Sequence, residues 1–103
     1  MPITAIVEFA AVEGEDPREG YDRVTRELNA GHPITRRSEF GEGLLAHAHS
    51  VTEDGGAVVV DVWQDQARMD AFIQRLQPIL ERDGTADLMS VRVLEAHSVV
   101  TDG

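Results

Sequence analysis

The tetrapeptide Glu53-Asp54-Gly55-Gly56 constrains the fold more than any other stretch of the chain, because it separates two apolar runs. Residues 44–52 (LLAHAHSVT) precede it and residues 57–63 (AVVVDVW) follow it. An Asp-Gly pair between two runs of strand-forming residues is typical of a tight β-hairpin turn. The sequence therefore predicts two neighbouring antiparallel strands in the middle of the chain.

The length of this hairpin loop decides which side chains share a face of the sheet. A two-residue loop places His47 and His49 beside the valines of the second strand. A three-residue loop with a bulge reverses that pairing and brings both histidines to the face of Asp61 and Trp63. Only the second arrangement makes a His–Asp pair, and the sequence leaves both open.

The N-terminal part of the chain predicts a strand followed by a helix. Residues 3–12 (ITAIVEFAAV) alternate between an apolar side and a mixed side, as a strand does. Asp16 can cap a helix, Pro17 suits its first position, and Glu19 stands three residues after the cap. The apolar stripe of this helix is Tyr21, Val24 and Leu28, and Asn29-Ala30-Gly31 closes it.

The remaining segments predict a connector, a second helix and a last strand. Residues 32–43 (HPITRRSEFGEG) form a polar connector. Asp65 caps a helix that runs to about Arg82 with strong helical periodicity, and Asp83-Gly84 ends it. Pro78 lies inside this pattern and is expected to kink or locally break the helix. Residues 88–99 then form the last strand.

The resulting order βαββαβ predicts an α+β, ferredoxin-like domain that comprises residues 1–103. Right-handed crossovers give one four-stranded antiparallel sheet in the spatial order 4-1-3-2, with both helices on one face. The other face has no cover, yet its strands are not cleanly polar. Because an apolar face in water is unusual for a monomer, we expect two such sheets to pack face to face in a homodimer.

Composition excludes several classes of function. The chain has 103 residues, with 19 acidic and 9 basic side chains and a net charge of −10, which disfavours nucleic acid and anionic membranes as partners. It has no cysteine, which excludes disulfides and thiolate chemistry. Its start, MPITAIVEF, has no signal-peptide pattern, and no apolar run reaches the roughly 20 residues that span a bilayer. We expect a cytoplasmic protein.

His47 and His49 are the most informative candidates, because both point to one face of the same strand. Three interpretations of this pair are open: metal ligands, groups that move protons, or histidines held by ordinary hydrogen bonds. A metal needs a third ligand, and His97 is on the strand at the opposite edge, about 14 Å away at ~4.8 Å per strand. A three-histidine site therefore needs a dimer interface, and we expect no metal and no cofactor.

Four further side chains are candidates for a binding site. Asp61 stands in an otherwise apolar strand, so its charge needs a partner, which Arg92 or an imidazole can supply. Trp63, Tyr21 and Phe72 face the core, where each either packs or lines a cavity. The basic pair Arg36-Arg37 is solvated or holds an anionic group at a cavity mouth.

Four segments carry a resemblance to a known family: residues 43–47 (GLLAH), 55–63 (GGAVVVDVW), 68–72 (RMDAF) and 76–78 (LQP). Together they resemble the dimeric α+β barrel superfamily, in particular proteins similar to antibiotic biosynthesis monooxygenases. The resemblance extends over residues 3–99. Two departures are residues 36–39, which match no family pattern, and the missing Asn near the first strand.

The resemblance implies a homodimer that binds a small aromatic or polyketide-like compound and oxidises it without a cofactor. It implies His47 as the base, Trp63, Tyr21 and Phe72 as walls of the cavity, and His49 and Asp61 as further substrate-binding residues. Two other classes of function stay open at this point: a non-catalytic interaction dimer and a histidine-based metal protein.

Overall fold

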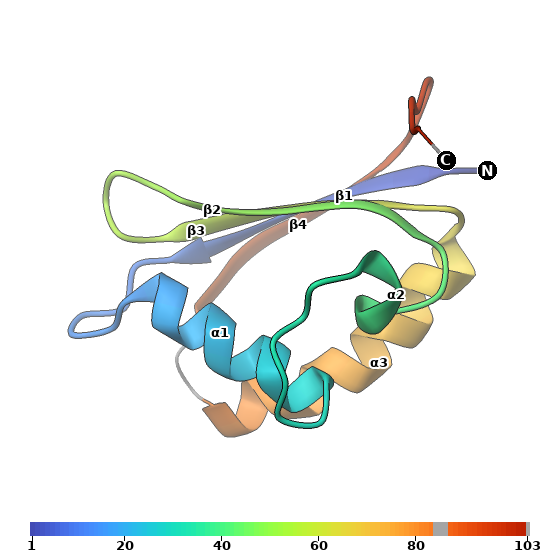
Figure 1. The fold of residues 1–103 in the computed structure, drawn as a ribbon. Coiled ribbons are helices and arrows are strands. Elements are labelled where there is room, and N and C mark those ends of the chain that lie inside the picture. Colours follow the sequence, from blue (N-terminus) through green and yellow to red (C-terminus); the bar gives the residue numbers. More distant parts are fainter. Residues whose placement is uncertain (84–86, 103) are drawn as a thin grey trace.

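The computed structural model describes residues 1–83 and 87–102, and its strands and two long helices follow the predicted order (Figure 1). The strands are β1 (Ile3–Ala10), β2 (Leu44–Val51), β3 (Ala57–Trp63) and β4 (Asp87–Glu95). The helices are α1 (Pro17–Leu28), α2 (Arg37–Phe40) and α3 (Gln66–Asp83). The chain therefore has the predicted βαββαβ order with one short additional helix.

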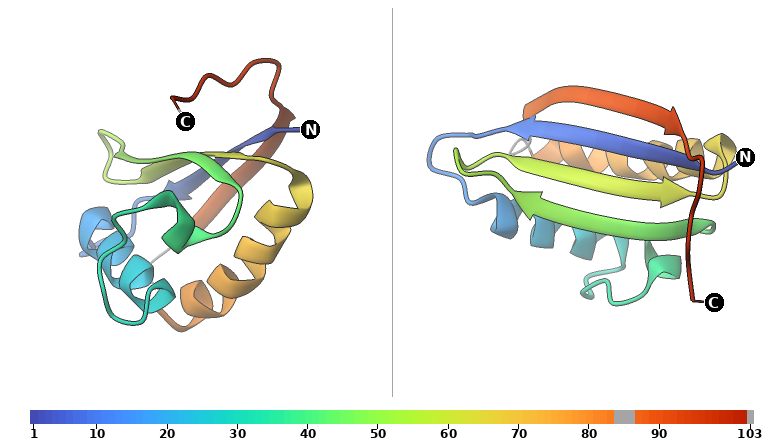
Figure 2. Two further views of the ribbon diagram at one scale, coloured as in Figure 1. Left: turned by 45° about the vertical axis from the view of Figure 1, so that its right-hand side comes forward. Right: turned by 90° about the horizontal axis from the view of Figure 1, so that it is seen from above.

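The four strands form one antiparallel sheet in the order β2-β3-β1-β4, which confirms the predicted strand order. All three helices lie on the same face of this sheet, and the other face carries no helix, with only the C-terminal tail on that side (Figures 1 and 2). The ferredoxin-like α+β architecture is thereby confirmed. The bounds of β3 agree with the prediction, and β1 and β4 are shorter than predicted.

Two predictions about the helical segments are corrected. Helix α3 continues through Pro78 to Asp83, so the proline does not break it, and Ile79 at the next position is buried. Residues 32–43 are not only a connector, since they contain α2. Gly84, which the sequence suggested as part of the helix end, lies outside the described residues.

Helix α2 is short, so side-chain contacts rather than its own backbone ladder hold it. The Glu39 carboxylate accepts hydrogen bonds from the backbone N–H groups of Thr35 and Arg36, both at 2.9 Å. Arg75 of α3 donates to the carbonyl of Phe40 at 2.6 Å and to the carbonyl of Leu28 at 3.3 Å. These bonds hold the buried Phe40 against the underside of the sheet.

The core lies between the sheet and the helices and is centred on Trp63. This indole has 0% of its surface exposed and packs against Phe72, with the ring centroids 5.2 Å apart. The buried cluster around it is Ile3, Ala5, Phe40, Leu44, Trp63, Met69 and Phe72. Large aromatic and aliphatic surfaces thus close the space beneath β1 and β3.

The hairpin between β2 and β3 has a three-residue loop, Glu53-Asp54-Gly55. Thr52 and Gly56 close it with a backbone hydrogen bond of 3.0 Å, and Gly55 has a φ of +89°. A residue in this left-handed conformation is usual at the end of a three-residue hairpin loop, and glycine adopts it without steric cost. The register is the second of the two alternatives, so His47 lies opposite Asp61.

The helix-free face of the sheet carries apolar and small side chains. Val60 of β3 is 37% exposed and Leu94 of β4 is 43% exposed. By the strand register this face also includes Thr4, Ile6, Glu8, Ala10, Ala46, Ala48, Ser50, Val58, Val62, Asp87, Ser90 and Arg92. Its charged residues are two acids, Glu8 and Asp87, and one base, Arg92, so the face carries only a small part of the chain's net charge of −10.

Replacement of Trp63 tests the core. We expect Trp63→Ala to lower the free energy of unfolding by about 3–5 kcal/mol, because a fully buried aromatic ring is replaced by a cavity. Urea unfolding followed by far-UV circular dichroism measures the change. The matched control is Ile73→Ala on the exposed side of α3, for which we expect less than about 1 kcal/mol. Equal losses in the two variants would contradict the assignment of Trp63 to the core.

Candidate active site

A histidine and a carboxylate face each other beneath the sheet. The Nδ1 atom of His47 lies 2.5 Å from Oδ1 of Asp61, and the two side chains are 14% and 10% exposed. The predicted need of Asp61 for a partner is met by the imidazole and not by Arg92, which the register places on the other face. An ionised carboxylate only accepts hydrogen bonds, so Nδ1 of His47 carries the proton of this bond.

The other nitrogen of His47 contacts α1. Its Nε2 atom lies 2.7 Å from the hydroxyl of Tyr21. With the Nδ1 proton directed at Asp61, a neutral imidazole accepts at Nε2, so the Tyr21 hydroxyl is the donor. Tyr21, His47 and Asp61 thus form a continuous chain of hydrogen bonds from α1 through β2 to β3.

Aromatic rings hold this chain in place. Phe40 of α2 packs on His47 with ring centroids 4.2 Å apart, and His49 stacks on Tyr21 at 4.1 Å. Tyr21 also stacks on His47, at 5.8 Å. Because each ring is fixed by a neighbour, the hydrogen-bonding atoms are positioned before any ligand binds.

The surroundings change the pKa of two of these groups. Burial, followed by the negative charges of Asp61 and Asp22, raises the pKa of Tyr21 to about 12. Burial, followed by the neighbouring His47, lowers the pKa of His49 below its usual range. At neutral pH Tyr21 is therefore a phenol, and the imidazole of His49 at the edge of the site is neutral.

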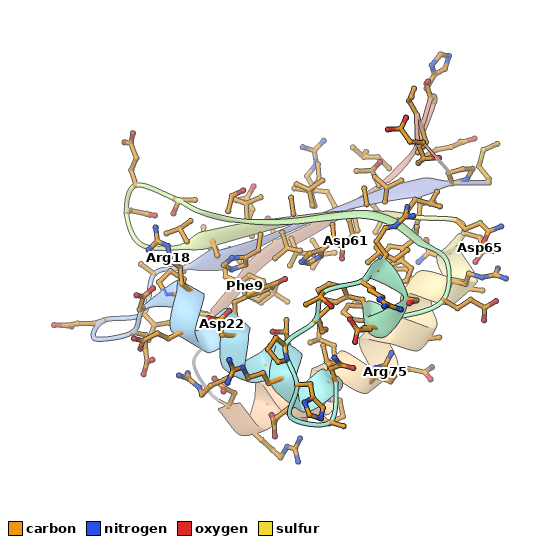
Figure 3. The ribbon with its side chains drawn as sticks, viewed as in Figure 1. Phe9, Arg18, Asp22, Asp61, Asp65 and Arg75 are labelled. Atoms are coloured by element: carbon orange, nitrogen blue, oxygen red, sulfur yellow. The ribbon has the colours of Figure 1, made fainter. Side chains whose placement is uncertain are left out.

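An open depression borders the site between α1 and β2. Its volume is about 520 Å³, and Arg18, Tyr21, Asp22, His49 and Val51 line it. Figure 3 shows Arg18 and Asp22 projecting from α1, and Asp61 beneath the sheet. Tyr21 and His49 connect this depression to the hydrogen-bond chain, whereas His47 and Asp61 lie behind them.

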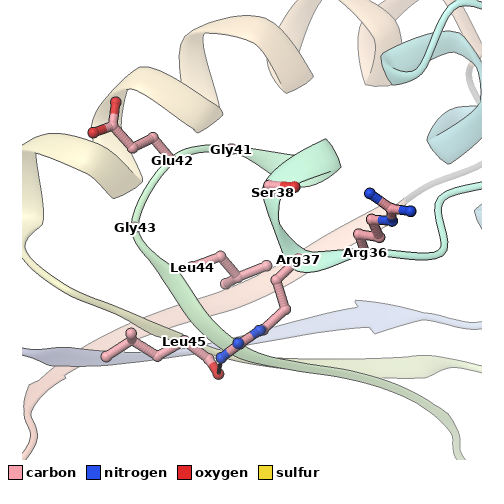
Figure 4. A pocket seen from close by; sticks show the side chains of 8 residues that line it. All are labelled: Arg36, Arg37, Ser38, Gly41, Glu42, Gly43, Leu44 and Leu45. Carbon is pink, nitrogen blue, oxygen red and sulfur yellow. Dashed lines mark hydrogen bonds between the residues drawn. The ribbon is translucent and has the colours of Figure 1, made fainter. Parts of the chain in front are cut away.

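A second depression, of about 400 Å³, lies beside α2 (Figure 4). Its lining includes the basic pair Arg36-Arg37 and the loop that leads into β2. The guanidinium of Arg37 donates to the backbone carbonyl of Leu45 at 2.8 Å. Arg37 thus stabilises the start of β2.

The structure brings together four of the six predicted site residues: His47, Asp61, Tyr21 and His49. Trp63 and Phe72 are instead in the core and line neither depression. Four contributors were not predicted: Phe40, Arg18, Asp22 and Val51. Two had a signal in the sequence, since Val51 continues the alternation of His47 and His49, and Arg18 precedes Tyr21 by one helical turn.

Phe40 had a weaker signal, as the one aromatic residue in the polar segment 32–43.

Within residues 1–83 and 87–102 the structure brings no group of three His, Cys, Asp or Glu side chains close enough to hold a metal ion. His97 follows β4, at the sheet edge opposite β2. Among the described residues no helix has the length and apolar character needed to cross a membrane.

Comparisons with known proteins give structural matches only. No family model matches the chain, and no curated protein matches it by sequence. Among solved structures, Rv0793 from Mycobacterium tuberculosis matches at 13% identity over 98% of this chain and 100% of its own, with a TM-score of 0.67. A candidate antibiotic biosynthesis monooxygenase from Chloroflexus aurantiacus matches at 11% identity over 100% of both chains, with a TM-score of 0.71.

SnoaB, a cofactor-independent oxygenase from Streptomyces nogalater, matches at 16% identity over 98% of both chains, with a TM-score of 0.63. These matches confirm the resemblance at the level of fold. The chain shares its α+β fold with the candidate antibiotic biosynthesis monooxygenase and with SnoaB.

The pKa of Tyr21 is directly measurable, because the chain contains a single tyrosine. We expect the absorbance of tyrosinate near 295 nm to titrate with a midpoint at about 12. In Asp61→Asn the midpoint falls, because a negative charge that opposes the phenolate is removed. Circular dichroism at each pH verifies that the protein stays folded. A wild-type midpoint near 10 in folded protein would contradict the described burial of Tyr21.

Proposed function

We propose that the protein is an enzyme that removes a proton from a small aromatic or polyketide-like compound and thereby allows molecular oxygen to oxidise it. The observation that carries the proposal is the pair of His47 and Asp61, with 2.5 Å between Nδ1 and Oδ1. A carboxylate that holds one nitrogen of an imidazole orients the ring and stabilises the imidazolium that forms when the other nitrogen takes a proton.

The chemistry balances without a cofactor. His47 is the base of the site, and loss of a proton leaves the substrate as a carbanion or phenolate. One electron passes from this anion to oxygen, and the resulting radical and superoxide combine to a peroxide. For an anthrone, loss of a second proton from the same carbon breaks the O–O bond. The products are a quinone and water, and each of them contains one of the two atoms of molecular oxygen.

The structural neighbours support this class of reaction, since SnoaB is described as a cofactor-independent oxygenase. The depression beside Tyr21 and His49 supports a small substrate, because its volume of about 520 Å³ is within the usual size of small-molecule sites. Trp63 and Phe72 have a packing role beneath the site in this proposal.

The proposal is tested by oxidation of anthrone and dihydroxyaromatic compounds, followed by quinone absorbance and oxygen consumption. We expect His47→Ala to lower turnover by about 10²–10⁴-fold, because a general base is removed. His97→Ala is the matched control, since His97 is exposed and distant from the site. Absence of turnover in the wild type, or equal turnover in His47→Ala, would count against the proposal.

We propose further that the protein is a homodimer whose helix-free sheet faces pack against each other. This face consists mostly of apolar and small side chains, with Val60 and Leu94 exposed, and such an area in water usually marks an interface. Its charges are Glu8, Asp87 and Arg92, so a second copy meets little net repulsion although each chain carries −10. The fold shared with the dimeric α+β barrel superfamily supports the same partner.

A lysine in the centre of this face tests the dimer. We expect Val60→Lys to shift sedimentation from a dimer of about twice 11.3 kDa to the monomer, because the ammonium is desolvated at the interface. The matched control is Val100→Lys in the C-terminal tail, where the side chain is 89% exposed. A monomeric wild type at micromolar concentration would refute this interface.

A further inference from the structure

Neither ring nitrogen of His47 is free to meet a substrate. Nδ1 is hydrogen-bonded to Asp61 at 2.5 Å, and Nε2 is hydrogen-bonded to the Tyr21 hydroxyl at 2.7 Å. The His47 side chain is 14% exposed and lines neither depression. A general base needs its acceptor atom within hydrogen-bond reach of the proton that it removes. The acceptor of His47 is already directed at Tyr21.

Tyr21 is placed differently, because it belongs to the hydrogen-bond chain and also lines the open depression of about 520 Å³. We propose that the Tyr21 hydroxyl is the catalytic group that touches the substrate, and that His47 and Asp61 act through it. This inference rests on the proposed function and assigns its proton-transfer step to particular atoms.

The proposed step moves two protons in one direction. The substrate gives a proton to the hydroxyl oxygen of Tyr21 while the phenolic proton moves to Nε2 of His47. The bond to the acidic hydrogen breaks and its electron pair stays on the substrate, so the substrate becomes an anion. His47 becomes an imidazolium beside Asp61, and Tyr21 is a neutral phenol before and after the step. The reverse transfer returns the proton when the product leaves.

The electrostatics of Tyr21 support a relay rather than a standing phenolate. Burial and the charge of Asp61 raise the pKa of Tyr21 to about 12, so a tyrosinate with a neutral His47 is scarce at neutral pH. The same carboxylate favours the imidazolium that the relay produces. Asp61 therefore disfavours a phenolate at Tyr21 and stabilises an imidazolium at His47.

The open shape of the depression restricts the substrate class. Tyr21 lines a surface hollow and not an enclosed cavity. To give its proton to the Tyr21 hydroxyl, a substrate in this hollow must carry the acidic hydrogen at its edge. Phenolic O–H groups and the methylene group of an anthrone satisfy this requirement. The stacking of His49 on Tyr21 at 4.1 Å occupies one face of the phenol ring, so the substrate is expected to approach Tyr21 from another side.

The test separates proton transfer from oxidation. Anthrone is incubated with the protein in deuterium oxide without oxygen, and deuterium uptake at its methylene group is measured above the buffer rate; oxidation is measured in air. We expect Tyr21→Phe, which keeps the ring and removes the hydroxyl, to lower both rates by about 10²–10⁴-fold, as His47→Ala does. His97→Ala retains the wild-type rates.

The outcomes distinguish the relay from the broader proposal. If His47→Ala loses both activities and Tyr21→Phe retains them, the relay is overturned and the proposed function stands. If the wild type shows neither exchange nor oxidation, both are overturned. An independent readout is the ¹⁵N spectrum of the imidazoles of the wild-type protein above pH 8. Neutral His47 with its proton on Nδ1 supports the relay, and a proton on Nε2 overturns it.

Discussion

The register of one hairpin is the constraint on which the site depends. Gly55, at a φ of +89°, allows a three-residue loop, and this odd number places His47 opposite Asp61 on the helix-covered face. A loop with one residue fewer would turn every side chain of β2 to the other face. The histidines would then stand on the bare face of the sheet, and Asp61 would be buried without an imidazole partner.

The same register separates two functions of the sheet. Its covered face holds the polar chain of Tyr21, His47 and Asp61, where burial strengthens the electrostatic coupling between the groups. Its bare face holds the valines of β3 and the alanines of β2, which suit close packing against another sheet. Binding of a small molecule beneath one face therefore does not compete with association through the other.

Much of the fold could be predicted from the sequence, because each element carries a local signal. The cap at Asp16, the Asp-Gly turn and the alternation of β1 and β3 act over a few residues, and the antiparallel order follows from topology rules. The resemblance to the dimeric α+β barrel superfamily, which implied this fold, also came from short segments. Helix α2 was missed because it is only four residues long and is held by contacts from other segments, from Arg75 to Phe40 and from Asn29 to Glu39.

The site could be predicted only in part, for a physical reason. The identity of His47 and Asp61 was readable, but their pairing depended on a single residue of loop length that Glu53-Asp54-Gly55-Gly56 does not decide by itself. The bond between Tyr21 and His47 depends on how α1 is placed beneath β2, and packing of the whole core sets that placement. For Trp63 the sequence left both core packing and a cavity wall open, and the structure places its indole in the core with no exposed surface.

Arg75 of α3 affects how well water is excluded from the His47–Asp61 pair, although it is distant from both residues in the sequence. Through the carbonyls of Phe40 and Leu28 it ties α2 and the end of α1 to α3, and Phe40 covers one face of the His47 ring. A four-residue helix opens with far less free energy than the sheet above it. We therefore expect amide hydrogen exchange in α2 to report how often water reaches the His47–Asp61 pair, and Arg75 of α3 to influence that frequency through Phe40.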